Sequence, residues 1–88
     1  MKAVVAPVLD SPARQKIITL LYLEPRSPSE LASALGLSQP YISNQLAALK
    51  SHHMVRSQRV GRRALYELEE PIRTALQGAL AGVAAVRG

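Results

Sequence analysis

The chain has 88 residues and a mass of 9.5 kDa, a size at which we expect a single globular domain. It contains no cysteine, which excludes disulfides, zinc–thiolate sites and iron–sulfur clusters and fits a cytoplasmic location. Eleven Lys and Arg against six Asp and Glu give a net charge of +5, and no apolar run approaches the roughly 18 residues of a membrane helix.

The excess positive charge is confined to the middle of the chain. No acidic residue lies between Leu31 and Tyr66, whereas the bases and acids outside this stretch balance each other. The acid-free stretch contains five basic residues, namely Lys50, Arg56, Arg59, Arg62 and Arg63. Such a local excess is typical of a protein that binds a polyanion, although an ordinary solvated basic surface has the same composition.

The first clear element in chain order is a helix predicted over residues 12–23. Ser11 can cap this helix, Pro12 suits its first position, and Pro25 ends it. The preceding residues, 1–11, are compatible with either an N-terminal arm or a short helix.

Two short helices follow in close succession. The first, predicted over 28–35, begins with the capping box Ser27-Pro28-Ser29-Glu30 and ends at Gly36, which suits a left-handed C-terminus. Ser38 can cap the second, predicted over 39–51. Two helices joined by a tight glycine-containing turn predict a helix-turn-helix. The second helix turns Ile42, Leu46 and Leu49 to one side and polar side chains to the other.

Two adjacent histidines, His52 and His53, come after the helix predicted over 39–51. Neighbouring residues on a helix do not face each other, and no third metal ligand is near in the sequence. Helix termination accounts for both, because histidine suits the C-terminal end of the helix dipole and His53 can take a left-handed cap.

The period of the apolar residues changes from 3.6 to 2 at Val55, which predicts a β-hairpin over 55–68. Its strands are predicted over 55–59 and 63–68, with a turn at 60–62. An isolated two-stranded hairpin is only marginally stable, so we expect it to lean on the helices. Three arginines lie near its tip, namely Arg59, Arg62 and Arg63.

The last helix, predicted over 71–86, has an apolar stripe that is wider than so small a domain requires. A chain of this length buries only about 60% of its unfolded surface, and self-association is the remaining means of adding to the core. We therefore expect the stripe to form a dimer interface, although it could fold back on its own domain. Its predicted interface residues are Ile72, Leu76, Ala79, Leu80, Val83 and Val86.

These elements predict a mainly α (α+β) fold of one domain over 1–88, a winged helix-turn-helix whose hairpin is the wing. The residues also resemble the ArsR/SmtB family of bacterial repressors. Leu9 to Arg14 resembles its Leu-x-x-Pro-x-Arg opening, residues 29–39 resemble its helix-turn-helix, and Gly61-Arg62-Arg63 resembles its wing. The resemblance implies a homodimer paired through the N- and C-terminal helices, DNA binding at an inverted repeat, and release by a metal ion or another signal.

The metal ligands of that family do not carry over to this chain. Where some members have Cys-x-Cys-Glu-Leu, this chain has Ser27-Pro28-Ser29-Glu30-Leu31. The ligand positions that other members use on the last helix are occupied here by Glu70, Ile72, Val83 and Val86. One oxygen ligand among apolar neighbours does not hold a transition metal, so we expect no metal and no cofactor. A small apolar ligand between the dimer helices, a partner protein or no effector at all stay open.

The charge and the resemblance together predict a surface that contacts double-stranded DNA. Side-chain amides on the helix at 39–51 can pair with adenine in the major groove, and the wing arginines can contact phosphate or enter the minor groove. Arg56 is closer to the body and could instead neutralise a helix end. The predicted contacts are Ser38, Gln39, Tyr41, Ser43, Asn44, Gln45, Lys50, Arg56, Arg59, Arg62 and Arg63.

We therefore predict a cytoplasmic, homodimeric, sequence-specific transcription regulator, most simply a repressor, whose effector is unknown. An enzyme is not expected, because the sequence has neither a glycine-rich phosphate loop nor a nucleophile motif. Two other interpretations use the same surfaces: a protein-interaction module, and an architectural DNA binder with little sequence preference. The acid-free stretch argues against the first, and the ratio of specific to non-specific affinity would separate the second.

Overall fold

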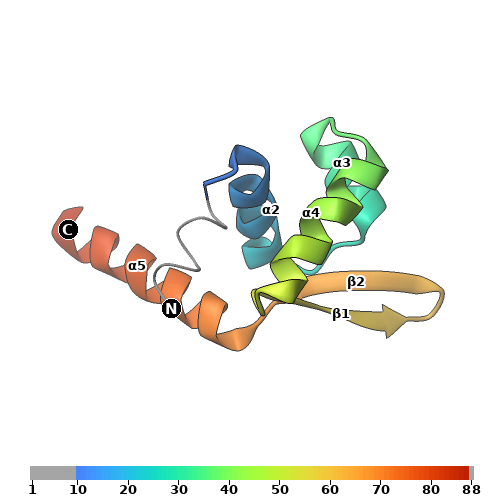
Figure 1. Ribbon diagram of the computed structural model, residues 1–88. Helices are drawn as coiled ribbons and strands as arrows, with labels where there is room; N and C mark the ends of the chain where they lie inside the picture. Colours follow the sequence, from blue (N-terminus) through green and yellow to red (C-terminus); the bar gives the residue numbers. More distant parts are fainter. Residues whose placement is uncertain (1–9, 88) are drawn as a thin grey trace.

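A computed structural model describes residues 10–87 of the chain (Figure 1). The arm or short helix predicted at 1–11 falls almost entirely outside the described residues. The described elements, in order, are α2 (Pro12–Leu23), α3 (Pro28–Leu35), α4 (Gln39–Ser51), β1 (Val55–Val60), β2 (Arg63–Leu68) and α5 (Glu70–Arg87). The first three helices have the predicted bounds, and α5 begins one residue earlier and ends one residue later than predicted.

Serine caps fix where the three central helices begin, as predicted. The Ser11 hydroxyl accepts from the Arg14 amide at 3.4 Å, and the Ser38 hydroxyl accepts from the Tyr41 amide at 3.2 Å. Ser27 forms the full capping box: its hydroxyl accepts from the Glu30 amide at 3.2 Å, while its own amide donates to Glu30 Oε1 at 2.8 Å. Each cap satisfies backbone N–H groups that have no partner within the helix.

A residue in the left-handed backbone conformation follows the end of α3, and another follows the end of α4. Gly36 has φ 68° at the end of α3, and His53 has φ 59° just after the cap residue of α4. Both positions were predicted to be helix terminators. Glycine accepts this conformation without steric cost, whereas histidine is one of the few other residue types enriched in it.

The wing is an antiparallel hairpin in which Val55 pairs with Leu68 and Val60 pairs with Arg63. The turn therefore contains two residues, Gly61 and Arg62, and the predicted turn at 60–62 was one residue too long. The turn can be this short because Gly61 has a φ of 64°, which allows a two-residue turn with glycine at its first position.

The hairpin is attached to the helices by a backbone pairing that the sequence did not predict. The Arg26 amide donates to the Tyr66 carbonyl at 3.1 Å, and the Tyr66 amide donates to the Arg26 carbonyl at 2.8 Å. This bridge joins β2 to the segment between α2 and α3. At the base of the hairpin Val55 and Leu68 are buried in the core, which provides the support that an isolated hairpin lacks.

The core lies between α2, α3, α4 and the base of the hairpin. Its residues are Ile17, Ile18, Leu21, Leu31, Ala32, Ile42, Leu46, Leu49, Met54, Val55 and Leu68. Helix α4 contributes three of them, and all three are fully buried. Because these positions share one side of α4, its opposite side is left to solvent.

Helix α5 leaves the hairpin and extends past α2, away from the helix-turn-helix (Figure 1). Its first turns are fastened to α2: the Arg73 guanidinium donates to the carbonyls of Tyr22 at 3.0 Å and Leu21 at 3.2 Å, and lies 5.4 Å from the centre of the Tyr22 ring. Ile72 and Leu76 pack partly on the core. The side chains from residue 80 onward, which include the predicted interface residues Leu80, Val83 and Val86, are outside the described set.

Candidate nucleic-acid interface

The solvent side of α4 carries most of the polar residues predicted to contact DNA. Gln39, Tyr41, Ser43, Asn44 and Lys50 are all exposed. Their positions follow from the burial of Ile42, Leu46 and Leu49 on the other side. The helix contains no acidic residue, so its exposed surface consists of neutral donors and acceptors with one cation near the end. Such a surface can make hydrogen bonds to base edges without repelling phosphate.

Ser38 stands just before this surface, and its hydroxyl is used as a helix cap. The hydroxyl oxygen accepts from the Tyr41 amide at 3.2 Å. A serine hydroxyl can accept one bond and still donate one, so the Ser38 proton is available to a phosphate or base oxygen while the cap stays in place.

Gln45 is the predicted contact whose surroundings differ most from expectation. It is half-buried on the flank of α4 toward α2, and its Oε1 accepts from Arg14 Nε at 2.8 Å. A guanidinium only donates, which identifies the atom facing it as the amide oxygen. The bidentate pair with adenine that the sequence suggested requires that same oxygen. In this conformation one lone pair of the oxygen is already used, while the second lone pair and the two amide N–H donors stay available.

Lys50 lies at the other end of the exposed surface of α4, near the wing. Its ammonium donates to the Ser57 hydroxyl of β1 at 3.3 Å, and both side chains remain accessible. The contact joins the last turn of α4 to the hairpin. Because ammonium has three donors, Lys50 can bind an anion without releasing Ser57.

The wing cations fall into two classes. Arg59 and Arg62 are exposed near the turn, and neither forms an ion pair with any residue from 10 to 87. Arg56 donates to Glu67 Oε2 at 3.0 Å and to Glu69 Oε1 at 3.1 Å. The hydrogen bonds to these two carboxylates, led by Glu67, raise the pKa of Arg56 above its ordinary value. The partners of Arg56 are thus two carboxylates. The sequence had suggested that Arg56 could neutralise a helix end.

Arg63 also has a carboxylate partner, on the helix-turn-helix. Its Nη2 donates to Glu30 Oε1 at 2.7 Å. The pKa of Glu30 is lowered from its ordinary 4.5, first by the hydrogen bond from the Ser27 amide and then by the bond from Arg63. This pair connects the first turn of α3 to the start of β2.

Four residues that the sequence did not predict to have a role bind predicted contact residues. They are Glu30, Glu67, Glu69 and Arg14. The Arg56–Glu67 contact had a usable signal, because the two residues face each other in the hairpin register and opposite charges favour such positions. The Arg14–Gln45 bond joins residues 31 positions apart, and no local pattern points to it.

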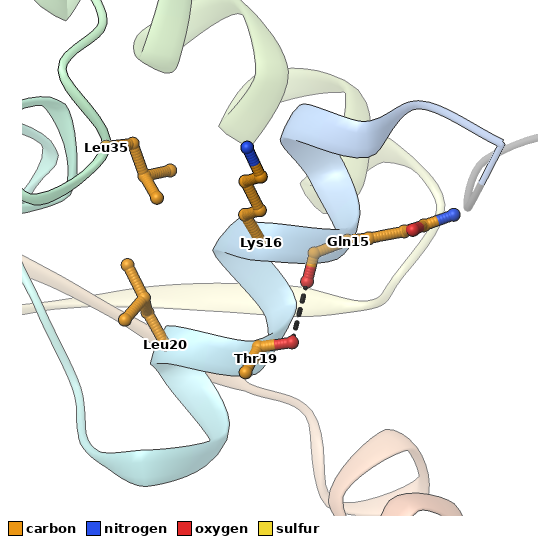
Figure 2. A pocket seen from close by; sticks show the side chains of 5 residues that line it. All are labelled: Gln15, Lys16, Thr19, Leu20 and Leu35. Carbon is orange, nitrogen blue, oxygen red and sulfur yellow. Dashed lines mark hydrogen bonds between the residues drawn. The ribbon is translucent and has the colours of Figure 1, made fainter.

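Two hollows flank α2, away from the exposed side of α4. One, of about 330 Å³, lies between α2 and the end of α3 and is lined by Gln15, Lys16, Thr19, Leu20 and Leu35 (Figure 2). Among these described lining residues, Lys16 has the only titratable side chain. The other, of about 190 Å³, lies between α2 and α5 and is lined by Ile18, Thr19, Tyr22, Leu76 and Ala79. Within the described part of the chain, no three His, Asp or Glu side chains gather as metal ligands would.

A family model described as the arsR family of bacterial regulatory proteins matches residues 11–57, more than half of the chain. The chain belongs to this family. Its sequence is 37% identical over 60 residues to the HTH-type transcriptional regulator NmtR of Mycobacterium tuberculosis, an alignment that covers 68% of this chain and 50% of NmtR. The chain thus spans about half the length of the curated relatives it matches.

Solved structures extend the likeness of this arsR-family chain to the wing and α5. The crystal structure of M. tuberculosis Rv0081 has a TM-score of 0.80 and 33% identity, over 96% of this chain and 85% of Rv0081. The homodimeric winged helix-turn-helix DNA-binding domain of Mb0332 from Mycobacterium bovis, a possible ArsR-family regulator, has a TM-score of 0.80 and 32% identity, over 94% and 76%. The predicted winged helix-turn-helix fold is confirmed.

The arsR-family chain also has no described helix with the length and apolar character needed to cross a bilayer. The family consists of regulatory proteins, which agrees with the prediction of a transcription regulator.

Proposed function

We propose that this arsR-family chain binds an inverted-repeat operator as a homodimer and represses transcription there. The observation that carries the proposal is the exposed side of α4, which is polar and free of acids. Beside it on the wing lie Arg59 and Arg62, which form no ion pair with the described residues. A helix of this kind fits the major groove. A promoter occupied in this way is closed to polymerase.

In the proposed complex the residues have distinct roles. Gln39, Ser43 and Asn44 meet base edges, because they occupy the exposed side of α4. Ser38 and Lys50 lie at the two ends of that side and, together with Tyr41, meet phosphate or sugar, which positions the helix without specifying sequence. On the wing, Arg59 and Arg62 lie over the adjacent backbone.

The proposed dimer forms through α2 and α5. The apolar hollow between them is lined by Ile18, Tyr22 and Leu76, and Ala75 and Ala79 are exposed on α5. A second copy would cover this surface and enlarge a core that is thin for a chain of this size. The Mb0332 domain, which has a TM-score of 0.80 and is homodimeric, supports a homodimer here.

We further propose that the signal is not a transition metal bound at the family's usual positions. Ser27 and Ser29 stand at one such position, where their hydroxyls lie 3.1 Å apart and the Ser27 hydroxyl also serves in the capping box. At the other, Ile72 follows Glu70 where a nitrogen ligand is required. Added Zn²⁺ or Ni²⁺ is therefore expected to leave operator affinity unchanged.

The test is a selection of genomic fragments by the purified full chain at about 150 mM salt, where binding through phosphate alone is weak. Enrichment of one inverted repeat near a promoter is the expected result. Enrichment without a shared sequence would indicate an architectural binder, and no retained DNA would remove the proposal. The Arg59→Gln/Arg62→Gln variant is the matched control, because it removes only the wing cations that have no ion pair among the described residues, and it should retain far less DNA.

A further inference from the structure

The outer half of the wing has one described ion pair to the rest of the domain. The base of the hairpin is held by the core residues Val55 and Leu68 and by the Arg26–Tyr66 backbone bridge. Arg63 lies beyond that bridge, immediately after the turn and opposite Val60. Its bond to Glu30 at 2.7 Å therefore restrains the hairpin close to its tip, where a two-stranded ribbon would otherwise bend and twist most freely.

Glu30 is held in place before Arg63 reaches it. The same atom, Oε1, accepts from the Ser27 amide at 2.8 Å and from Arg63 Nη2 at 2.7 Å. Ser27 is buried, so the capping box anchors the carboxylate to a fixed part of the domain. A preorganised acceptor loses little side-chain freedom when the guanidinium binds, which is the condition under which a surface ion pair has a measurable effect.

The pairing also divides the positive charge of the wing. Carboxylates neutralise Arg56 and Arg63, whereas Arg59 and Arg62 form no ion pair with the described residues. Arg62 and Arg63 are adjacent in sequence, yet within the described residues Arg63 is paired with a carboxylate and Arg62 is not. Phosphate binding by Arg62 breaks no ion pair with the described residues. Arg63 keeps further N–H donors, but its charge is already offset by the Glu30 carboxylate, so a phosphate gains less from it.

We propose that Arg63 is a positioning residue, whose ion pair with Glu30 sets the wing against the helix-turn-helix and withholds that charge from DNA, while Arg62 contacts phosphate. This assignment rests on the proposed DNA-binding function and separates two residues that the sequence analysis had grouped together. Specific binding then depends on Arg63 through the geometry of the wing, and on Arg62 through charge.

The positioning role is tested without DNA, by amide hydrogen exchange of β1 and β2. Glu30→Gln and Arg63→Gln should each speed exchange near the turn by about two- to fivefold, the range of an exposed ion pair. Glutamine also serves at this position of a capping box, so Glu30→Gln removes the charge and keeps α3 capped. Arg62→Gln is the matched control and should leave exchange unchanged. Equal rates in all four proteins would overturn the positioning role.

A double variant shows whether the two residues act on each other. If the pair is the cause, Glu30→Gln/Arg63→Gln should exchange no faster than either single variant, because each single change already breaks the bond. Additive acceleration would mean that Glu30 and Arg63 act separately, and would also overturn the positioning role.

The withheld charge is tested by the salt dependence of operator binding. Each phosphate contact contributes about 0.9 to the slope of log affinity against log salt. Arg62→Gln should lower the slope by about that amount per wing, and Arg63→Gln should weaken binding severalfold with the slope unchanged. Glu30→Gln frees Arg63 and should raise the slope by up to about 0.9 per wing.

The outcomes separate this inference from the proposed function. Loss of slope in Arg63→Gln equal to that in Arg62→Gln would show that Arg63 leaves Glu30 for phosphate, and an unchanged slope in Glu30→Gln would show that no charge is withheld. Either result overturns the inference while DNA binding stands. A wild-type chain that binds no duplex would instead remove the proposed function, and the exchange rates would still decide whether the pair positions the wing.

Discussion

The helix-turn-helix and the wing present their predicted DNA contacts in different ways. On α4 the exposed side chains are placed by the burial of Ile42, Leu46 and Leu49 behind them, so packing decides their direction. On the wing most residues are accessible, and ion pairs decide which cations are available. The difference indicates that the first surface depends on the core and the second on charge.

The strongest test of this comparison removes the packing behind α4. Leu46 is fully buried, and Leu46→Ala should lower the free energy of unfolding by about 2–5 kcal/mol, a large share of the stability of so small a domain. Urea denaturation measures this loss. Arg62→Ala, the counterpart on the wing, should stay within about 0.5 kcal/mol of the wild type. Equal losses of unfolding free energy in the two variants would contradict the conclusion that the core supports α4 whereas charge determines the wing.

The exposed side of α4 should show the converse behaviour. Asn44→Ala changes a solvent-facing residue, so stability should be almost unaffected. Affinity for the operator should fall by about 1–3 kcal/mol per site through the loss of a base contact. Titration with operator and with random duplex in parallel measures the specific and the non-specific affinity. A similar loss on the two duplexes would show that Asn44 contacts the backbone and does not specify sequence.

The capping box of α3 lies where the two regions meet. Ser27→Ala removes the bond from the Glu30 amide to the Ser27 hydroxyl and should cost about 1 kcal/mol of stability. Alanine keeps the backbone amide that holds the Glu30 carboxylate, but the uncapped first turn of α3 should fray and loosen this anchor, so wing exchange should quicken. Ser38→Ala, which removes a cap from α4, is the control: a similar loss of stability is expected there, without the effect on the wing.

The smallest expected effect is the response of stability to acid. The pKa of Glu30 is lowered from 4.5 in the folded chain by the Ser27 amide and Arg63. A carboxylate with a depressed folded pKa stabilises the protein above its ordinary pKa, and this contribution is lost as pH falls through the folded value. Thermal melts from pH 6 downward should therefore converge for the wild type and Glu30→Gln below about pH 4.5. A constant difference between the two at all pH values would speak against the ion pair.

Local features of the sequence determined most of the secondary structure. The caps at Ser11, Ser27 and Ser38 act over three residues, and the terminator Gly36 acts within one turn, so each is visible in a short segment. The burial of one side of α4 follows equally from spacing, because residues 3 and 4 apart share a side of a helix. The bounds of α2, α3 and α4 could therefore be predicted from residues near each end.

Tertiary structure decided which of the predicted contact residues are free. The bond from Arg14 to the Gln45 oxygen spans 31 positions, and the bond that fastens Arg73 to Leu21 spans 52. Arg62 and Arg63 are identical in type and adjacent in sequence, yet one faces solvent and the other faces Glu30. The sequence determined that a basic wing would exist beside a polar helix. Only the folded chain decided how its charges pair, because ion pairs depend on distances between segments that folding alone brings together.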